Sequence, residues 1–113
     1  MSQPNGHGEK TLAHWRLEID ALDTELLRLL NRRAAIAGEI AVIKVAMGIP
    51  AYDARREEQV LERVAAKSTG PFDRASIAAI FRSIIHETRR LGTERMELQN
   101  RGPMVIAEPS EPS

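Results

Sequence analysis

A single apolar stripe with helical spacing runs for 36 residues, from Leu12 to Met47, and constrains the fold of this chain more than any other feature. Apolar residues recur there in steps of three and four, which is typical of one face of an α-helix. They are Trp15, Ile19, Leu22, Leu26, Leu29, Leu30, Ile36, Ile40, Ile43 and Met47. Gly38 is the one weak interior residue, and no proline interrupts the run. We therefore expect one long helix that ends at Gly48, because Pro50 cannot continue it.

The length of this helix predicts a partner chain. At 1.5 Å per residue it would be roughly 54 Å long. A compact domain of 113 residues is only about 35 Å across, so the helix would overhang a single-chain fold. The overhanging apolar stripe needs a cover, and the same stripe on a second copy is the simplest one. We expect an intertwined homodimer; the alternative is a kink at Gly38 that folds the helix back on itself.

Two further helices follow in the sequence. Asp53 can cap a second helix that ends near Lys67, and Asp73 can cap a third that runs to about Leu98. The apolar positions of the second are Val60, Leu61, Val64 and Ala65, and those of the third are Ile77, Ile80, Phe81, Ile84, Ile85 and Leu91. No segment alternates like a strand. The predicted fold class is all-α, with a long, a short and a long helix.

Composition limits the organisation and the partners. Residues 11–100 form one domain by size, and residues 1–10 and 101–113 are expected to be disordered tails. The sixteen Lys and Arg balance the sixteen Asp and Glu, so nothing favours binding to nucleic acid or to a membrane. Without cysteine the chain has no disulfide and no thiolate nucleophile. A cytoplasmic location is expected, since no apolar leader or spanning segment is present.

Cations occur where the long stripe should be apolar. Arg33 lies three residues after Leu30, and Lys44 lies four after Ile40, so both point toward the buried side. A core-facing charge costs several kcal/mol unless it is paired or binds a ligand. Arg33 and Lys44 are roughly 16 Å apart along the helix and could close on one small anion. The alternative is that they snorkel and pair with acidic residues of the chain itself.

Arg16 could join that pocket only from another chain. It lies seventeen residues before Arg33, or about 25 Å along the helix. An antiparallel partner helix would bring it close. A second polar cluster, with Asp53, Arg56 and Glu57, lies on the first turn of the second helix. Capping explains Asp53, but it does not explain why Arg56 and Glu57 occur together.

Together these residues resemble a known family. The matching segments are Arg16-x-x-Ile19-x-x-Leu22-Asp23, Leu29-Leu30-Asn31-Arg32-Arg33, Ile40-Ala41-x-x-Lys44 and Asp53-x-x-Arg56-Glu57. In this order and spacing they resemble the all-helical, AroQ-type chorismate mutases, which have the chorismate mutase type II fold. The likeness covers about Leu12 to Leu91. Gly70-Pro71-Phe72 and Ile80-Phe81-x-x-Ile84 look most like mutase domains fused to DAHP synthase, so DAHP synthase is a candidate partner.

The resemblance implies a function in the shikimate pathway to aromatic amino acids. It implies an isomerase that converts chorismate to prephenate by an intramolecular Claisen rearrangement, with no cofactor and no metal. The family forms intertwined dimers with shared sites. By position, Arg16 of one chain and Arg33 of the other would hold the two substrate carboxylates. Lys44 would face the ether oxygen, with Arg56 nearby.

The remaining implied contacts lie around the substrate ring. Glu57 and the region of Asp53 would accept a hydrogen bond from the ring hydroxyl, and Thr88 would lie near the ring carboxylate. Many family members carry Gln or Glu one turn after Thr88, whereas this chain has Gly92. The missing donor leaves open a weakly active or non-catalytic module that binds chorismate or prephenate and regulates a DAHP synthase. An isochorismate pyruvate-lyase or an aminodeoxychorismate mutase would share the fold.

One basic run has no role in this implied site. Arg89, Arg90 and Arg95 lie near the end of the third helix, where cations favour the helix dipole. We expect them to form a solvated face, which could dock an acidic partner.

Overall fold

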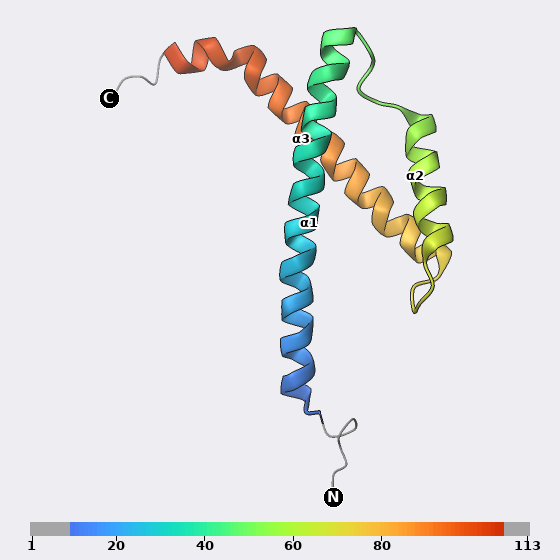
Figure 1. Ribbon diagram of the computed structural model, residues 1–113. Coiled ribbons are helices and arrows are strands. Elements are labelled where there is room, and N and C mark those ends of the chain that lie inside the picture. Colours follow the sequence, from blue (N-terminus) through green and yellow to red (C-terminus); the bar gives the residue numbers. More distant parts are fainter. Residues whose placement is uncertain (1–9, 108–113) are drawn as a thin grey trace, which may run out of the picture. The chain divides into compact units, whose positions relative to one another are not determined.

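The computed structural model describes residues 10–107 and contains three α-helices. Figure 1 labels them α1 (Leu12–Met47), α2 (Ala54–Lys67) and α3 (Arg74–Ala107). The predicted all-α class and its long, short, long order are confirmed. The chain divides into two compact units, one ending at Ile36 and the other starting at Ala37, so each is described by itself.

The first unit holds most of α1. The helix begins after Thr11, whose hydroxyl oxygen accepts a hydrogen bond from the backbone N–H of His14 at 3.1 Å. The predicted single helix is confirmed, since α1 runs unbroken through Gly38 to Met47. No residue of α1 is buried, and Trp15 is 50% exposed. The predicted apolar stripe therefore lies open in the single chain.

The predicted stop after Met47 is confirmed at Gly48, which has the left-handed φ of +71°. The N–H of Gly48 donates to the carbonyl of Val45 at 3.1 Å, and the N–H of Ile49 donates to the carbonyl of Lys44 at 2.8 Å. This pair of bonds is a Schellman motif, which satisfies carbonyls that the helix end leaves free. The motif turns the chain out of α1 into the short connection to α2.

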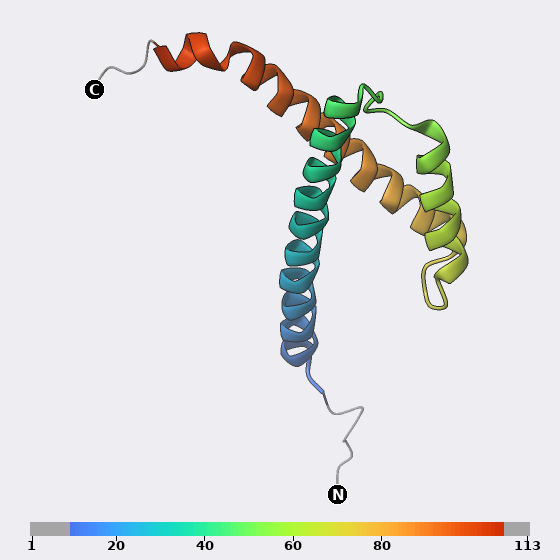
Figure 2. The ribbon, with the colours of Figure 1, turned by 45° about the horizontal axis from the view of Figure 1, so that its top comes forward.

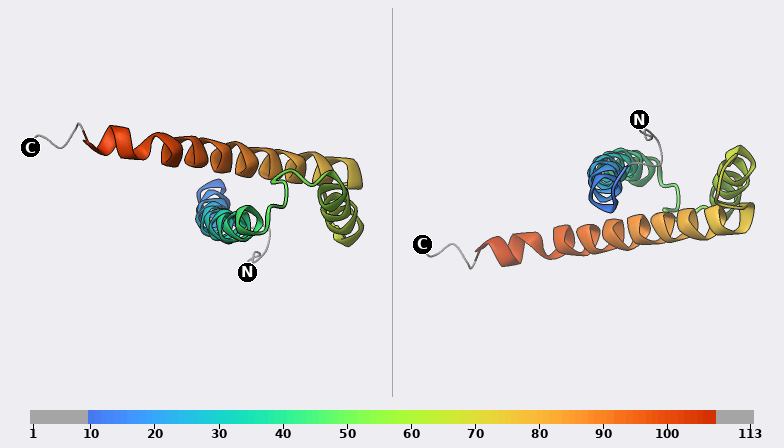
Figure 3. Two further views of the ribbon diagram at one scale, coloured as in Figure 1. Left: turned by 90° about the horizontal axis from the view of Figure 1, so that it is seen from above. Right: turned by 90° about the horizontal axis from the view of Figure 1, so that it is seen from below.

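In the second unit, α2 and α3 form a helical hairpin. Figures 2 and 3 show α2 beside the first turns of α3. The core of the hairpin is formed by the buried residues Val60, Leu61 and Ala65 on α2. These are three of the four residues predicted for that face, and the fourth, Val64, is half-buried.

Both predicted caps of the hairpin are confirmed. An Asp53 carboxylate oxygen accepts from the N–H of Arg56 at 3.0 Å, and an Asp73 oxygen accepts from the N–H of Ser76 at 2.8 Å. The hydrogen bonds from Ser76 lower the pKa of Asp73 below its ordinary value of 3.8. Each aspartate thus satisfies one of the free N–H groups at the start of its helix.

The end of the third helix was predicted wrongly. It was expected near Leu98, but α3 continues to Ala107, so residues 101–107 are helical. The helix continues although Gly102 and Pro103 disfavour a helix interior, by about 1 and 3 kcal/mol relative to alanine, and four apolar residues, Met104 to Ala107, follow them. Residues 1–9 and 108–113 of the expected tails lie outside the described residues, and the division into tails and domain stays a prediction. Within residues 10–107, no helix is long and apolar enough to cross a membrane.

Candidate active site

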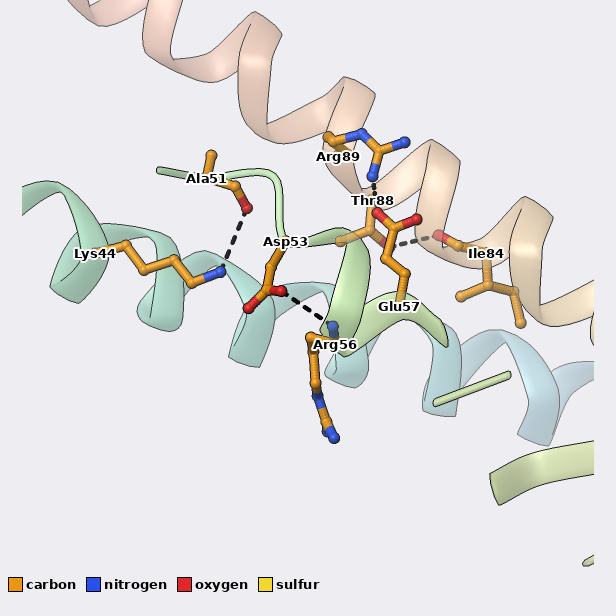
Figure 4. A network of polar contacts seen from close by, with 8 residues as sticks. All are labelled: Lys44, Ala51, Asp53, Arg56, Glu57, Ile84, Thr88 and Arg89. Carbon is orange, nitrogen blue, oxygen red and sulfur yellow. Dashed lines mark hydrogen bonds and ion pairs between the residues drawn. The ribbon is translucent and has the colours of Figure 1, made fainter. Parts of the chain in front are cut away.

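Polar side chains gather where α1 ends and α2 begins (Figure 4). Lys44 lies on the last turn of α1, and its Nζ donates to the carbonyl oxygen of Ala51 at 3.3 Å. Its side chain is half-buried, as the stripe position predicted. The Schellman motif and this hydrogen bond together hold the ammonium group against the connection that leads to Asp53.

Arg56 and Glu57 point to different sides of α2. The guanidinium of Arg56 extends away from the carboxylate of Glu57 and is exposed. Glu57 is half-buried and forms an ion pair with Arg89 of α3. Consecutive helical side chains diverge by about 100°, so one of the two faces α3 and the other does not. The structure thus places Glu57 in a bridge between the two helices.

Arg89 is the residue that sequence reasoning missed. Besides its ion pair with Glu57, its guanidinium carbon lies 4.6 Å from the centroid of the Tyr52 ring. The prediction of a solvated basic run is therefore wrong for Arg89. A signal was present, because Phe81, Ile85 and Arg89 follow one another at intervals of four and so share the core-facing side of α3.

The prediction of a solvated basic residue is confirmed for Arg90. Its side chain is exposed and pairs within α3 with Glu87 at 2.9 Å and Glu94 at 2.7 Å. Both carboxylates raise the pKa of Arg90, and Glu87 has the larger effect. Exposed pairs of this kind stabilise little.

Thr88 and Gly92 lie one turn apart on α3. The Thr88 hydroxyl donates to the carbonyl of Ile84 at 2.7 Å, which leaves its oxygen free to accept. A Cβ added at Gly92 would meet no atom within 4 Å. A side chain larger than that of glycine would therefore fit at position 92, one turn from Thr88.

Arg16 and Arg33 belong to the first unit. Arg33 is half-buried although its neighbour Arg32 is exposed, and Arg16 is exposed. Elsewhere in this unit, Glu25 pairs with Arg28, which lowers the pKa of Glu25. Among the side chains described, up to residue 95, no ion pair involves the four predicted substrate-binding cations: Arg16, Arg33, Lys44 and Arg56. The alternative of internal acidic partners for these cations finds no support there.

The residues are suited to bind an anion. Among the described side chains, up to residue 95, no three His, Asp or Glu gather as potential metal ligands. Arginine and lysine side chains bind carboxylates well, because arginine offers a planar pair of donors and lysine a compact charge.

Comparison with known proteins assigns the family. The model of chorismate mutase type II matches residues 15–93, which is most of the chain, and the chain therefore belongs to that family. In structure it is similar to form II of the chorismate mutase from Thermus thermophilus, with a TM-score of 0.72 and 32% identity. That match covers 74% of this chain and 96% of the other.

The curated relatives include larger proteins. The chain is 36% identical over 78 residues to the bifunctional chorismate mutase/prephenate dehydratase of Aquifex aeolicus, and 37% identical over 99 residues to that of Neisseria gonorrhoeae. These matches cover 66% and 88% of the chain but only 22% and 24% of the relatives. A chorismate mutase of Methanocaldococcus jannaschii is 38% identical over 53 residues, covering 47% of this chain and 54% of its own. The chain spans less than a quarter of the bifunctional relatives.

Proposed function

We propose that this protein is a chorismate mutase that converts chorismate to prephenate. The observation that carries the proposal is the pair of half-buried cations Arg33 and Lys44, which have no ion-pair partner among the described residues of a chain in the chorismate mutase family. A dicarboxylate substrate would supply the missing negative charge. The open apolar stripe of α1 supports a dimer in which Arg16 of the second chain completes the site.

The reaction takes place within one molecule, so the protein contributes geometry and field. Arg33 and the partner chain's Arg16 clamp the two carboxylates, which selects the compact conformer in which the reacting carbons approach. As the carbon–oxygen bond breaks, negative charge grows on the ether oxygen. Lys44, with Arg56 nearby, stabilises that charge more strongly in the transition state than in the bound substrate.

The other proposed contacts fix the substrate ring. Glu57 accepts a hydrogen bond from the ring hydroxyl, with Asp53 close to the same group. The Thr88 hydroxyl contacts the ring carboxylate. The half-buried Glu57 and Thr88 support this, because both lie on the sides of α2 and α3 that are partly shielded from solvent.

Gly92 supports a second candidate function. A chain that lacks a donor beside the ether oxygen could bind chorismate or prephenate and regulate a DAHP synthase instead of catalysing rapidly. The bifunctional relatives are joined to prephenate dehydratase, so the DAHP synthase partner rests on the sequence resemblance alone. The presence of Arg33, Lys44 and Arg56 nevertheless favours a catalyst, even a slow one, over a module that only binds.

A direct assay separates the candidates. Purified protein is mixed with chorismate, chorismate loss is followed by absorbance, and products are resolved by chromatography, with and without a DAHP synthase from the same source. Prephenate formed by the protein alone supports the mutase. Loss at the uncatalysed rate in both mixtures, with prephenate still bound in calorimetry, supports the regulator. Isochorismate and aminodeoxychorismate serve as rival substrates, and preference for either would contradict the proposal.

A further inference from the structure

The guanidinium of Arg89 is held from two directions. One nitrogen donates to Oε2 of Glu57, and the guanidinium carbon lies 4.6 Å from the centroid of the Tyr52 ring (Figure 4 shows the pair with Glu57). The Arg89 side chain is only 35% exposed and that of Glu57 only 24%. An arginine stacked on an aromatic ring loses much of its freedom, so its fork is fixed before it meets the carboxylate.

Tyr52 and Glu57 occupy defined places at the start of α2. Tyr52 directly precedes the cap Asp53, and Glu57 is the fourth residue of the helix. In a hydrophobic staple these two positions contact each other through apolar side chains. Here Arg89 of α3, 32 positions after Glu57, contacts both of them instead. The start of α2, and with it the carboxylate of Glu57, is therefore oriented from α3.

The ion pair leaves half of the carboxylate available. Arg89 engages Oε2 of Glu57, and for Oε1 the described residues provide no hydrogen bond. A glutamate has three rotatable side-chain bonds, so an unheld carboxylate would populate many positions. With Oε2 fixed, Oε1 has a defined direction in which to accept a hydrogen bond.

We propose that Arg89, held by the Tyr52 ring, is a positioning residue that aims Oε1 of Glu57 at the ring hydroxyl of the substrate. The inference rests on the proposed function, because it assigns a supporting role for the proposed contact of Glu57. Arg89 acts through Glu57 and does not touch the substrate. If Arg89 only clamped α2 to α3, its effect on KM would not depend on the contact between Glu57 and the substrate.

A double-mutant cycle tests the proposal on the full-length protein. Arg89→Met and Glu57→Met should each raise KM for chorismate at least tenfold and change kcat by less than threefold, since the ring hydroxyl is not a reacting group. The KM of the double variant should lie within about threefold of the higher of the two single-variant KM values, because both changes remove the same contact. A double variant whose KM rises by the product of the two single effects, a hundredfold or more, would overturn the proposal. So would an unchanged KM in Arg89→Met.

Matched variants separate positioning from folding. Tyr52→Leu removes the stacking face and should raise KM severalfold, whereas Tyr52→Phe keeps the ring and should match the wild type. Arg90→Met, one residue along, should also match it, because the described ion pairs of Arg90 lie within α3. If Arg89→Met does not fold, the Tyr52 pair decides the question, and equal KM values for the Leu and Phe variants would contradict the proposal. A wild type that does not consume chorismate would refute the proposed function itself, before any variant is compared.

Discussion

Gly92 is a position at which the sequence resemblance predicts Gln or Glu. It lies one turn after Thr88 on α3, and beyond its chain neighbours and the adjoining helix backbone no described atom lies within 4 Å of the position that a Cβ would take. By that resemblance, a donor at position 92 would face the ether oxygen on which negative charge develops in the proposed reaction. The position therefore has space for a larger side chain, and glycine supplies no hydrogen-bond donor there.

We predict that Gly92→Gln accelerates the proposed reaction. One transition-state donor is worth about 10²–10³ in rate by analogy with oxyanion holes, and we expect kcat to rise by at least tenfold toward that range. Steady-state kinetics with chorismate measure the change. Gly92→Ala is the matched control, because it adds the Cβ and helix propensity without a donor, and its kcat should stay at the wild-type value. Equal gains in both variants would show that helix stability, not the donor, limits the rate.

Arginine at position 33 should not be replaceable by lysine. Arg33→Lys keeps the charge but loses the planar fork that binds a carboxylate with two hydrogen bonds. The loss of one charged hydrogen bond, about 1.5–3 kcal/mol, corresponds to a fall in kcat/KM of roughly ten- to a hundredfold. Arg32→Lys, at the exposed neighbouring residue, should change kcat/KM by less than twofold. Full activity of Arg33→Lys would remove Arg33 from the site.

The cap at Asp73 gives the stability of the hairpin a pH dependence of known sign. Because hydrogen bonds from Ser76 lower the pKa of Asp73 in the folded chain, its stabilising contribution is present above the ordinary value of 3.8 and is lost as pH falls through the lower folded pKa. Asp73→Ala should therefore be less stable than the wild type at pH 5–7, with the difference disappearing in strong acid. Denaturant titrations across pH measure it. Asp73→Asn keeps a cap that does not titrate, so a wild-type acid dependence in that variant would contradict the assignment.

Among the helices, α1 has one correctable weakness. Glycine in a helix interior costs about 1 kcal/mol relative to alanine, and Gly38 lies in the middle of α1. A Cβ there would lie 3.7 Å from Nη1 of Arg95, an ordinary contact. Gly38→Ala should thus stabilise the protein by up to about 1 kcal/mol in denaturant titration. A loss of stability would show that a neighbouring helix packs closely on Gly38.

The helices themselves follow from local sequence signals. The apolar spacing of three and four, the aspartates at positions 53 and 73 and the glycine at position 48 act within one or two turns, so they could be read without tertiary information. The end of α3 could not, because Gly102 and Pro103 are ordinary stop signals and yet α3 runs through both to Ala107.

The candidate site was predictable only in part. Arg33 and Lys44 stand out because a charge interrupts an apolar stripe, and the structure leaves both half-buried. Arg89 of α3 meets Glu57 of α2, 32 positions away, and Tyr52, which lies just before α2, and only the packing of α2 against α3 brings them together. Which of the three positively charged residues of the run turns inward depends on that packing.

For the whole molecule, the central question is whether one site is built from two chains. The open stripe of α1, with Trp15 50% and Leu26 56% exposed, is more apolar surface than a lone soluble helix normally leaves in water. A second copy would cover it and, by the proposal, would bring its Arg16 close to Arg33. The proposed substrate clamp therefore requires the dimer.

Mixing two inactive variants tests this claim most directly. Arg16→Ala and Arg33→Ala chains are each purified, shown to be inactive, unfolded together at equal amounts and refolded. Random pairing makes half of the dimers mixed, and each mixed dimer has one intact site, so about a quarter of the wild-type activity should return. Co-purification of two different tags verifies that mixed dimers formed. Mixed dimers with no activity would contradict the account.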